Sequence, residues 1–247
     1  MTVFYDLLAD HYDELTDTPA RSKAAQAFVA EFLKRYPCKS ALDVACGTGV
    51  YTLPLAKAGV AATGSDLSQS MLDRAAQAAN GVGLSIPLVQ ASMQELSQRI
   101  TGPFEAILCM GNSLPHLVSD ADLDAAVASF VGLLSPGGVL AVQLLNYTRV
   151  LQDRERVVGV DRHEPRVYVR FYDFLENLVR FNVLEMDLSG NQVTHTLHET
   201  TLRPLQAGEL HTLMTRHGLH DIELFGSGKF EPFDPATSQT LLVVGRK

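Results

Sequence analysis

A short glycine turn is the part of this sequence best suited to binding a ligand. Residues 41–45 (ALDVA) are typical of a buried strand, Cys46–Gly49 (CGTG) of a tight turn, and residues 50–58 of a helix. Glycines let a ligand approach the backbone closely, and the free N–H groups at a helix N-terminus favour an anionic group. The sequence therefore predicts a small-ligand site at this strand–turn–helix.

A carboxylate, Asp66, follows seventeen residues after Gly49, at the end of a second predicted strand over residues 60–65. A carboxylate in this position can accept hydrogen bonds from the two cis-hydroxyls of a ribose. The alternative is an Asp that caps the next helix. A nicotinamide dinucleotide fingerprint needs a third glycine where this chain has Thr52, so the pair favours another nucleoside ligand.

Polar side chains follow two further predicted strands, at residues 104–110 and 139–145. They are Asn112, Ser113, His116, Asn146 and Tyr147. The carboxyl ends of parallel strands meet at one edge of a sheet, so we expect these side chains near the ligand. His116 could take up a proton near neutral pH, or could bond to the backbone and shape its loop. The two asparagines could equally be turn residues.

The elements that must position these residues alternate between strand and helix. A further strand is predicted at 84–90, and helices at 21–35, at 69–79 with Ser68 as its cap, and at 122–134, where SPGG at 135–138 ends it. Alternation with short loops implies a doubly wound α/β fold, with a parallel sheet covered on both faces.

The pattern changes after Asn146. Short alternating segments predict an antiparallel β insertion over 148–204, which we expect to act as a lid or substrate-selecting element; they lie at 166–174, 178–187 and 192–203. A helix at 206–217 and strands at 220–226 and 240–244 follow. We expect one domain over 1–247, with an N-terminal helical cap over 1–36 that begins as a short helix and loop in 1–20.

Composition limits the class of partner. The 247 residues are 46% hydrophobic and 19% charged, with a net charge of −8. An acidic globular chain disfavours nucleic acid and anionic membranes, and no apolar run is long enough to span a membrane. Three cysteines without metal-type spacing suit the cytoplasm. His195 and His198 would point to opposite faces of a strand, so we expect no metal site.

Three segments together resemble the class I S-adenosylmethionine-dependent methyltransferases. They are LDVACGTG, GSDLSQSML around Asp66, and SPGGVLAV before residue 143. MGNSLPHL, the Asn146-Tyr147 pair and the closing GSGKFEPFDP are similar to the glycine N-methyltransferase branch. The resemblance implies a Rossmann-like methyltransferase fold with S-adenosylmethionine as cofactor and S-adenosylhomocysteine as product.

The resemblance also implies roles for individual residues toward the cofactor. Tyr5 and Tyr12 would close over it, Arg21 would bind its carboxylate, and Asp66 its ribose hydroxyls. The other expected contacts are Ala45 and Gly47 along the methionine part, Leu67, Met71, Ser92 and Met93 at the adenine, and Met110 near the reactive centre.

Methyl transfer is an in-line displacement that needs a positioned acceptor lone pair, and we expect a small-molecule amine as acceptor. The predicted catalytic residues are His116, Asn112 and Tyr147, while Ser113 and Asn146 complete the predicted acceptor-binding set. Where the glycine-methylating enzymes have a carboxylate-binding arginine, this chain has Leu145. Glycine is therefore disfavoured unless an arginine of the insertion (Arg166, Arg170 or Arg180) replaces it.

Other interpretations remain open. A protein that binds the cofactor without transferring the methyl group would share the turn and Asp66, and the acceptor atom could be oxygen or carbon. The loop Asn112–Pro115 lacks the Pro-Pro-aromatic pattern with which nucleic-acid amino-methyltransferases hold a flipped base, so no nucleic-acid substrate is expected. This chain lacks the long N-terminal extension that the glycine enzyme uses in assembling its tetramer. We therefore expect a monomer or homodimer.

Overall fold

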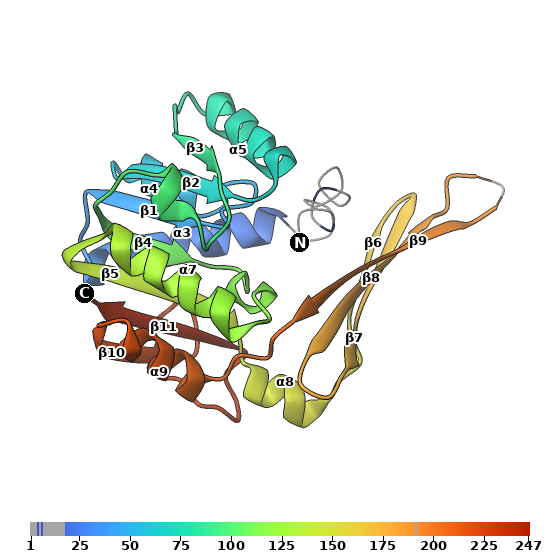
Figure 1. Cartoon of the computed structure of the whole chain (residues 1–247). Coiled ribbons are helices and arrows are strands. Elements are labelled where there is room, and N and C mark those ends of the chain that lie inside the picture. Colours follow the sequence, from blue (N-terminus) through green and yellow to red (C-terminus); the bar gives the residue numbers. More distant parts are fainter. Residues whose placement is uncertain (1–3, 5, 7–17, 191) are drawn as a thin grey trace.

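The computed structural model describes residues 4, 6, 18–190 and 192–247. Within them, a seven-stranded sheet carries the helices, and a separate four-stranded sheet stands out from this body (Figure 1). The strands of the large sheet are β1 Ser40–Val44, β2 Ala61–Asp66, β3 Leu88–Gln90, β4 Phe104–Cys109, β5 Leu134–Leu145, β10 His220–Phe225 and β11 Thr240–Arg246. The small sheet comprises β6 Val157–His163, β7 Arg166–Phe174, β8 Val179–Asp187 and β9 Thr194–Leu202.

The large sheet has the order β10-β11-β5-β4-β1-β2-β3. Strands β3, β2, β1, β4 and β5 are parallel, and β11 runs antiparallel to both of its neighbours. The chain moves outward from β1 first to β2 and β3, then to β4 and β5 on the other side. A crevice outside the carboxyl end of β1 is where such a sheet binds ligands. The predicted doubly wound sheet is confirmed.

The helices cover both faces of the large sheet. They are α3 Thr18–Arg35, α4 Thr52–Lys57, α5 Gln69–Gly81, α6 Leu96–Arg99, α7 Asp120–Leu133, α8 Tyr147–Asp153 and α9 Ala207–Arg216, with a 3-10 turn at Leu114–His116. Side chains alternate along β4: Ile107 and Cys109 join the core under α7 and α9, while Leu108 and Met110 join the core under α3 and α4. Each face therefore has its own apolar layer.

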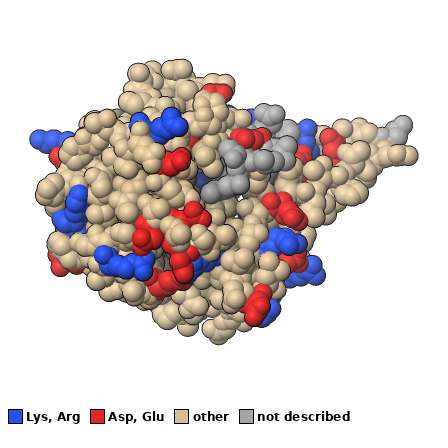
Figure 2. All heavy atoms as spheres, viewed as in Figure 1, with Lys and Arg blue, Asp and Glu red and all other residues tan. Residues whose placement is uncertain are grey.

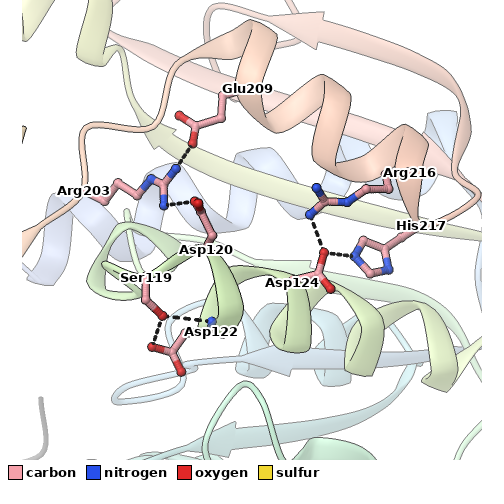
Figure 3. Close-up of polar contacts among 8 residues, drawn as sticks. All are labelled: Ser119, Asp120, Asp122, Asp124, Arg203, Glu209, Arg216 and His217. Atoms are coloured by element: carbon pink, nitrogen blue, oxygen red, sulfur yellow. Dashed lines mark hydrogen bonds and ion pairs between the residues drawn. The ribbon is translucent and has the colours of Figure 1, made fainter.

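Polar contacts fasten the end of the insertion to the body (Figure 3). Arg203, just after β9, forms ion pairs with Asp120 at 2.6 Å and with Glu209. Asp124 of α7 bonds to Arg216 and, at 3.0 Å, to His217 of the neighbouring α9 region. The chain leaving the small sheet is thus held between the starts of α7 and α9.

Several predicted boundaries need correction. β3 begins at Leu88 instead of residue 84, because the Leu84 N–H bonds to Ala79 and closes α5. β5 begins at Leu134, which pairs with Phe104 before a register shift, so residues 135–138 lie inside the strand instead of preceding it. β6 lies within the predicted insertion but was not predicted as a separate strand, and α8 was not predicted. The predicted helix and loop over residues 1–20 lies almost entirely outside the described residues.

Candidate functional site

A cavity of about 160 Å³ lies at the carboxyl ends of β1, β2 and β4. It contains the glycine turn and most of the predicted cofactor residues. Those that line it are Arg21, Ala45, Gly47, Asp66, Leu67, Met71, Ser92 and Met93. Tyr5 and Tyr12 lie outside the described residues. The structure therefore gathers eight of the predicted cofactor residues around one space.

Asp66 builds the turn as well as facing the cavity. Its Oδ2 accepts the Gly47 backbone N–H at 2.8 Å, and its Oδ1 accepts the Ser68 N–H at 2.9 Å. Burial raises the pKa of Asp66 above its usual value, an effect that these N–H donors oppose. A carboxylate has about four lone-pair sites, so Asp66, which lines the cavity, keeps acceptor capacity for a ligand hydroxyl.

The two positions of the turn that hold glycine require it for different structural reasons. Gly47 has φ +55°, and a Cβ there would meet no atom within 4 Å, so its missing side chain leaves open space in the cavity. Gly49 has φ +83°, and a Cβ would lie 2.5 Å from Leu53 and 3.4 Å from Ala75. Gly47 therefore leaves room for a ligand beside the backbone. Gly49 allows Leu53 of α4 and Ala75 of α5 to pack closely against the turn.

Arg21 extends from α3 to the cavity. A Cβ on Gly111 would lie 3.1 Å from its Nη2, which places the guanidinium beside the β4 loop backbone. Arg21 also lies near Asp43, whose carboxylate accepts the Thr52 hydroxyl at 2.6 Å. Burial raises the pKa of Asp43 to about 7, partly opposed by the Thr52 hydrogen bond and the charge of Arg21. Asp43 does not line the cavity.

Met110 departs from its predicted place. It is 4% exposed and packs in the core under α3 and α4, because alternation along β4 turns its side chain away from the cavity. Its carbonyl instead accepts the Ser113 hydroxyl at 2.8 Å. Several further residues line the cavity and were not predicted as cofactor contacts: Cys46, Thr48, Val50, Ser68, Ala91, Gln94 and Gly111. All except Val50 are chain neighbours of predicted residues, and that adjacency was the available signal.

A second cavity of about 440 Å³ lies between the body and the small sheet. Gly111 and His116 line both cavities. Apolar side chains contribute much of the second wall: Phe4, Leu145, Val150, Val158, Phe181 and Leu202. Its charged or phenolic members are Arg149, Asp153, Glu155, Arg170 and Tyr172. A molecule here would meet a ligand of the first cavity at Gly111 and His116.

His116 stands at the junction of the two cavities. Its Nδ1 lies 3.3 Å from the Thr200 hydroxyl, which ties the 3-10 turn to β9. Burial lowers the pKa of His116 to about 4. The ring is therefore neutral at pH 7 and can form hydrogen bonds, but it does not retain a proton there. Of the two roles considered for His116, proton uptake near neutral pH is disfavoured by this lowered pKa.

Asn112 connects the ends of β4 and β5. It has φ +64°; its Oδ1 accepts the Leu145 N–H at 3.0 Å, and its Nδ2 donates to the Tyr147 hydroxyl at 3.0 Å. Tyr147 is 1% exposed and lines neither cavity. Burial raises the pKa of Tyr147, so its hydroxyl stays protonated. Among these residues Asn112 reaches the second cavity, and Tyr147 supports it from behind.

Asn146 and Ser113 also differ from the predicted arrangement. Asn146 is 2% exposed, and its Nδ2 donates to the carbonyls of Pro235 and Ser238, each at 2.9 Å. It lines neither cavity, because its side chain fastens the β5 end to the segment before β11. Ser113 lines the first cavity instead of the second.

The structure distinguishes the three insertion arginines that could replace the carboxylate-binding arginine absent at position 145. Leu145 itself lines the second cavity, and so does Arg170, whose Nη2 lies 2.8 Å from Asp161. Arg166 lies 3.4 Å from Glu185, and neither it nor Arg180 lines the cavity. The Arg170 Nε is buried with no hydrogen-bond partner. Arg170 is thus the insertion arginine placed to meet an acceptor.

The two histidines of β9 lie on opposite faces, as their spacing predicts. His198 is 7% exposed and bonds to Glu185 at 3.3 Å, while His195 is exposed. The part of the chain that the structure describes contains no group of three His, Cys, Asp or Glu side chains that could hold a metal ion. Nor has any described helix the length and apolar content needed to cross a membrane.

Phe4 and Asp6, the two described residues before α3, each contact a residue that lines a cavity. Phe4 is buried against Phe181, with ring centroids 6.2 Å apart, and lines the second cavity. Asp6 accepts a hydrogen bond from the Ser68 hydroxyl, on the wall of the first cavity.

Comparisons with known proteins agree with this geometry. Residues 41–138 match a family described as a methyltransferase domain. The chain is 31% identical to a glycine/sarcosine N-methyltransferase from Parasynechococcus marenigrum, over 88% of this chain and 76% of that one. It is 33% identical to a glycine/sarcosine N-methyltransferase from Halorhodospira halochloris, over 60% of this chain and 55% of that one. This match thus spans only about half of the Halorhodospira protein.

Solved structures share the fold over nearly the whole chain. An S-adenosylmethionine-dependent methyltransferase from Clostridium acetobutylicum superimposes with a TM-score of 0.83 at 20% identity, covering 98% of both chains. DesVI from Streptomyces venezuelae gives 0.77 at 26% identity, covering 96% of this chain and 97% of that one.

Proposed function

Since the chain belongs to the class I S-adenosylmethionine-dependent methyltransferases, close to the glycine N-methyltransferases, we propose that it methylates the nitrogen of a small-molecule amine. The observation that carries the proposal is the pair of cavities that meet at Gly111 and His116. The first holds S-adenosylmethionine, the cofactor of this family, and the second holds the acceptor.

The residues of the first cavity fit this cofactor. Asp66 lines the cavity and keeps acceptor capacity for a ribose hydroxyl, and the open space at Gly47 admits the methionine part beside the backbone. Arg21 supplies a positive charge for the carboxylate, while Met71 and Leu67 provide an apolar wall for the adenine. When bound, the cofactor supplies a methyl group on a positively charged sulfur, which is an excellent leaving group.

The acceptor must present a neutral nitrogen lone pair. His116 is neutral at pH 7, because burial lowers its pKa to about 4, so it orients the acceptor by hydrogen bonding. The methylated ammonium product loses its proton after it leaves the cavity. Asn112, held by Leu145 and Tyr147, fixes the backbone next to His116. The protein's contribution is therefore chiefly orientation and exclusion of water.

The second cavity favours an acceptor larger than glycine. Leu145 offers no ion pair to a carboxylate at the place where the glycine-methylating enzymes have an arginine. Arg170 offers donors farther out, on the small sheet. An acceptor with an apolar part near Leu145 and an oxygen near Arg170 would match both walls.

A screen with methyl-labelled S-adenosylmethionine tests this proposal. Primary amines, secondary amines, phenols and carboxylic acids of matched size are each incubated with the enzyme. We expect label in amines, and more in those larger than glycine. Label confined to phenols or carboxylic acids contradicts the nitrogen acceptor.

A further inference from the structure

One side-chain contact joins the insertion to the junction of the two cavities. The Thr200 hydroxyl, on β9, lies 3.3 Å from Nδ1 of His116, 84 positions earlier in the chain. His116 lines both cavities, whereas Thr200 lines neither. Any influence of Thr200 on a bound ligand must therefore pass through the His116 ring.

The end of β9 is fixed against the 3-10 turn by its backbone as well. The Arg203 N–H donates to the carbonyl of Pro115 at 2.7 Å, so the chain after β9 is bonded to the residue next to His116. Between them, Leu202 is 3% exposed and lines the second cavity. A threonine side chain is branched at Cβ and stiff at χ1. The Thr200 hydroxyl thus keeps its direction toward the ring once the strand is in place.

The Arg203 side chain anchors the same segment to the body (Figure 3). It pairs with Asp120 at 2.6 Å and with Glu209. A guanidinium held by two carboxylates is better fixed than a single exposed ion pair. In Figure 2, acidic and basic side chains lie beside one another over α7 and α9. β9 therefore meets the 3-10 turn in a defined register.

The chemistry of an amine acceptor sets a requirement on the His116 ring. Burial lowers the pKa of His116 to about 4, so at pH 7 its neutral ring has one N–H and one nitrogen lone pair. An attacking amine uses its own lone pair for the methyl carbon and has only N–H groups to offer the protein. A ring nitrogen that meets the amine must therefore be an acceptor, and the ring N–H must lie on the other nitrogen.

We propose that Thr200 is a positioning residue: its hydroxyl oxygen accepts the Nδ1–H of His116 and holds the tautomer whose Nε2 accepts an N–H of the acceptor amine. This inference rests on the proposed methylation of an amine. The hydrogen bond to Nε2 directs the amine lone pair at the methyl carbon, about 3–3.5 Å away in a productive complex. The alternative tautomer, with Thr200 as donor, would aim an Nε2–H at that lone pair and oppose its attack.

Nitrogen NMR of the ring tests the tautomer without any methyl transfer. Protein labelled with ¹⁵N-histidine is saturated with S-adenosylhomocysteine, and the His116 signals are assigned by their loss in His116→Gln. We expect a protonated Nδ1 and an unprotonated Nε2 in the wild type and in Thr200→Ser. Thr200→Val keeps the branched shape without the hydroxyl and should lose this preference. A wild-type ring protonated on Nε2 overturns the proposal.

The matched control is Thr201→Val. Thr201 is the next residue of β9, and strand alternation places it on the opposite face of the sheet, away from His116. Its variant should keep the wild-type tautomer and the wild-type kcat. A change of tautomer in Thr201→Val equal to that in Thr200→Val would contradict a specific contact.

Kinetics with the best amine from the screen tests the link to catalysis. Thr200→Val should lower kcat about tenfold by loss of orientation, with S-adenosylhomocysteine affinity unchanged, and Thr200→Ser should restore most of it. In a His116→Gln background Thr200→Val should have no further effect, because Thr200 acts through the ring. An equal loss in both backgrounds overturns the positioning role. Absence of methyl transfer to every amine would overturn the proposed function instead, while the NMR result still decides the tautomer.

Discussion

The Asp66 carboxylate accepts the backbone N–H of Gly47 at 2.8 Å, which joins the end of β2 to the turn after β1. The same carboxylate accepts the Ser68 N–H and thereby fixes the start of α5. One side chain thus shapes three walls of the cofactor cavity. It also lines the space where the ribose is expected.

Asp66→Ala should weaken S-adenosylhomocysteine binding by at least about tenfold, because it removes hydrogen bonds from a charged acceptor and releases the turn. Calorimetry gives the dissociation constant. Asp66→Asn keeps one acceptor oxygen, so its dissociation constant should lie between those of the wild type and Asp66→Ala. Asp73→Ala is the matched control, since Asp73 is exposed on the following helix, α5, and bonds only locally to Gln69 among the contacts described. Equal affinities for Asp66→Ala and Asp73→Ala would remove Asp66 from the site.

His116 should remain neutral over the pH range of activity. Burial lowers its pKa from 6.5 to about 4, so its ring signals in a histidine NMR titration should not shift between pH 5.5 and 8. Because the unfolded chain binds this proton below pH 6.5, the His116 contribution to stability is present above that pH and is lost as pH falls toward 4.

The activity of His116 variants separates orientation from proton transfer. His116→Ala should lower kcat/KM about 10- to 100-fold by loss of orientation. His116→Gln should lower it less and leave the acidic limb of the pH–rate profile in place. A shift of that limb in His116→Gln would instead assign a proton-transfer role to the ring.

Arg170→Lys should raise the acceptor KM about tenfold and leave S-adenosylhomocysteine affinity unchanged. The reason is that Arg170 lines the second cavity and does not line the first. Arg166→Lys is the matched control: Arg166 lies on the same strand and pairs with Glu185 outside the cavity. Steady-state kinetics with the best amine from the screen compares them. Equal KM values for both variants would exclude Arg170 from acceptor binding.

Asp43 should make the fold less stable as pH rises. Burial raises its pKa from 3.8 to about 7, so the folded state binds a proton between these values that the unfolded chain releases. The Asp43 contribution is favourable near pH 4 and is lost toward pH 7. Asp43→Asn keeps an acceptor for the Thr52 hydroxyl and should flatten this dependence, with a gain at pH 8 on the order of a few kcal/mol. Urea unfolding at pH 5 and pH 8 measures it.

The sequence was most informative where the pattern is local. The turn at Gly47, the Ser68 cap, which accepts the Met71 N–H, and the strand Arg166–Phe174 were all predicted and are confirmed. Met110 was misplaced because strand alternation decides which face it meets. Asn146 was misplaced because its partners, Pro235 and Ser238, lie about ninety residues away in the chain. The choice of Arg170 over Arg166 needed the strand register and the cavity, which spacing alone does not give.

The most direct test of the account is the position of the transferred methyl group. The enzyme is incubated with S-adenosylmethionine carrying a ¹³C-methyl group and the best amine from the screen, and the product is observed by carbon NMR. We predict a single new N–¹³CH₃ signal that requires the enzyme and is strongly reduced in Asp66→Ala. An O–¹³CH₃ or C–¹³CH₃ signal, or a signal of equal strength in Asp66→Ala, contradicts it.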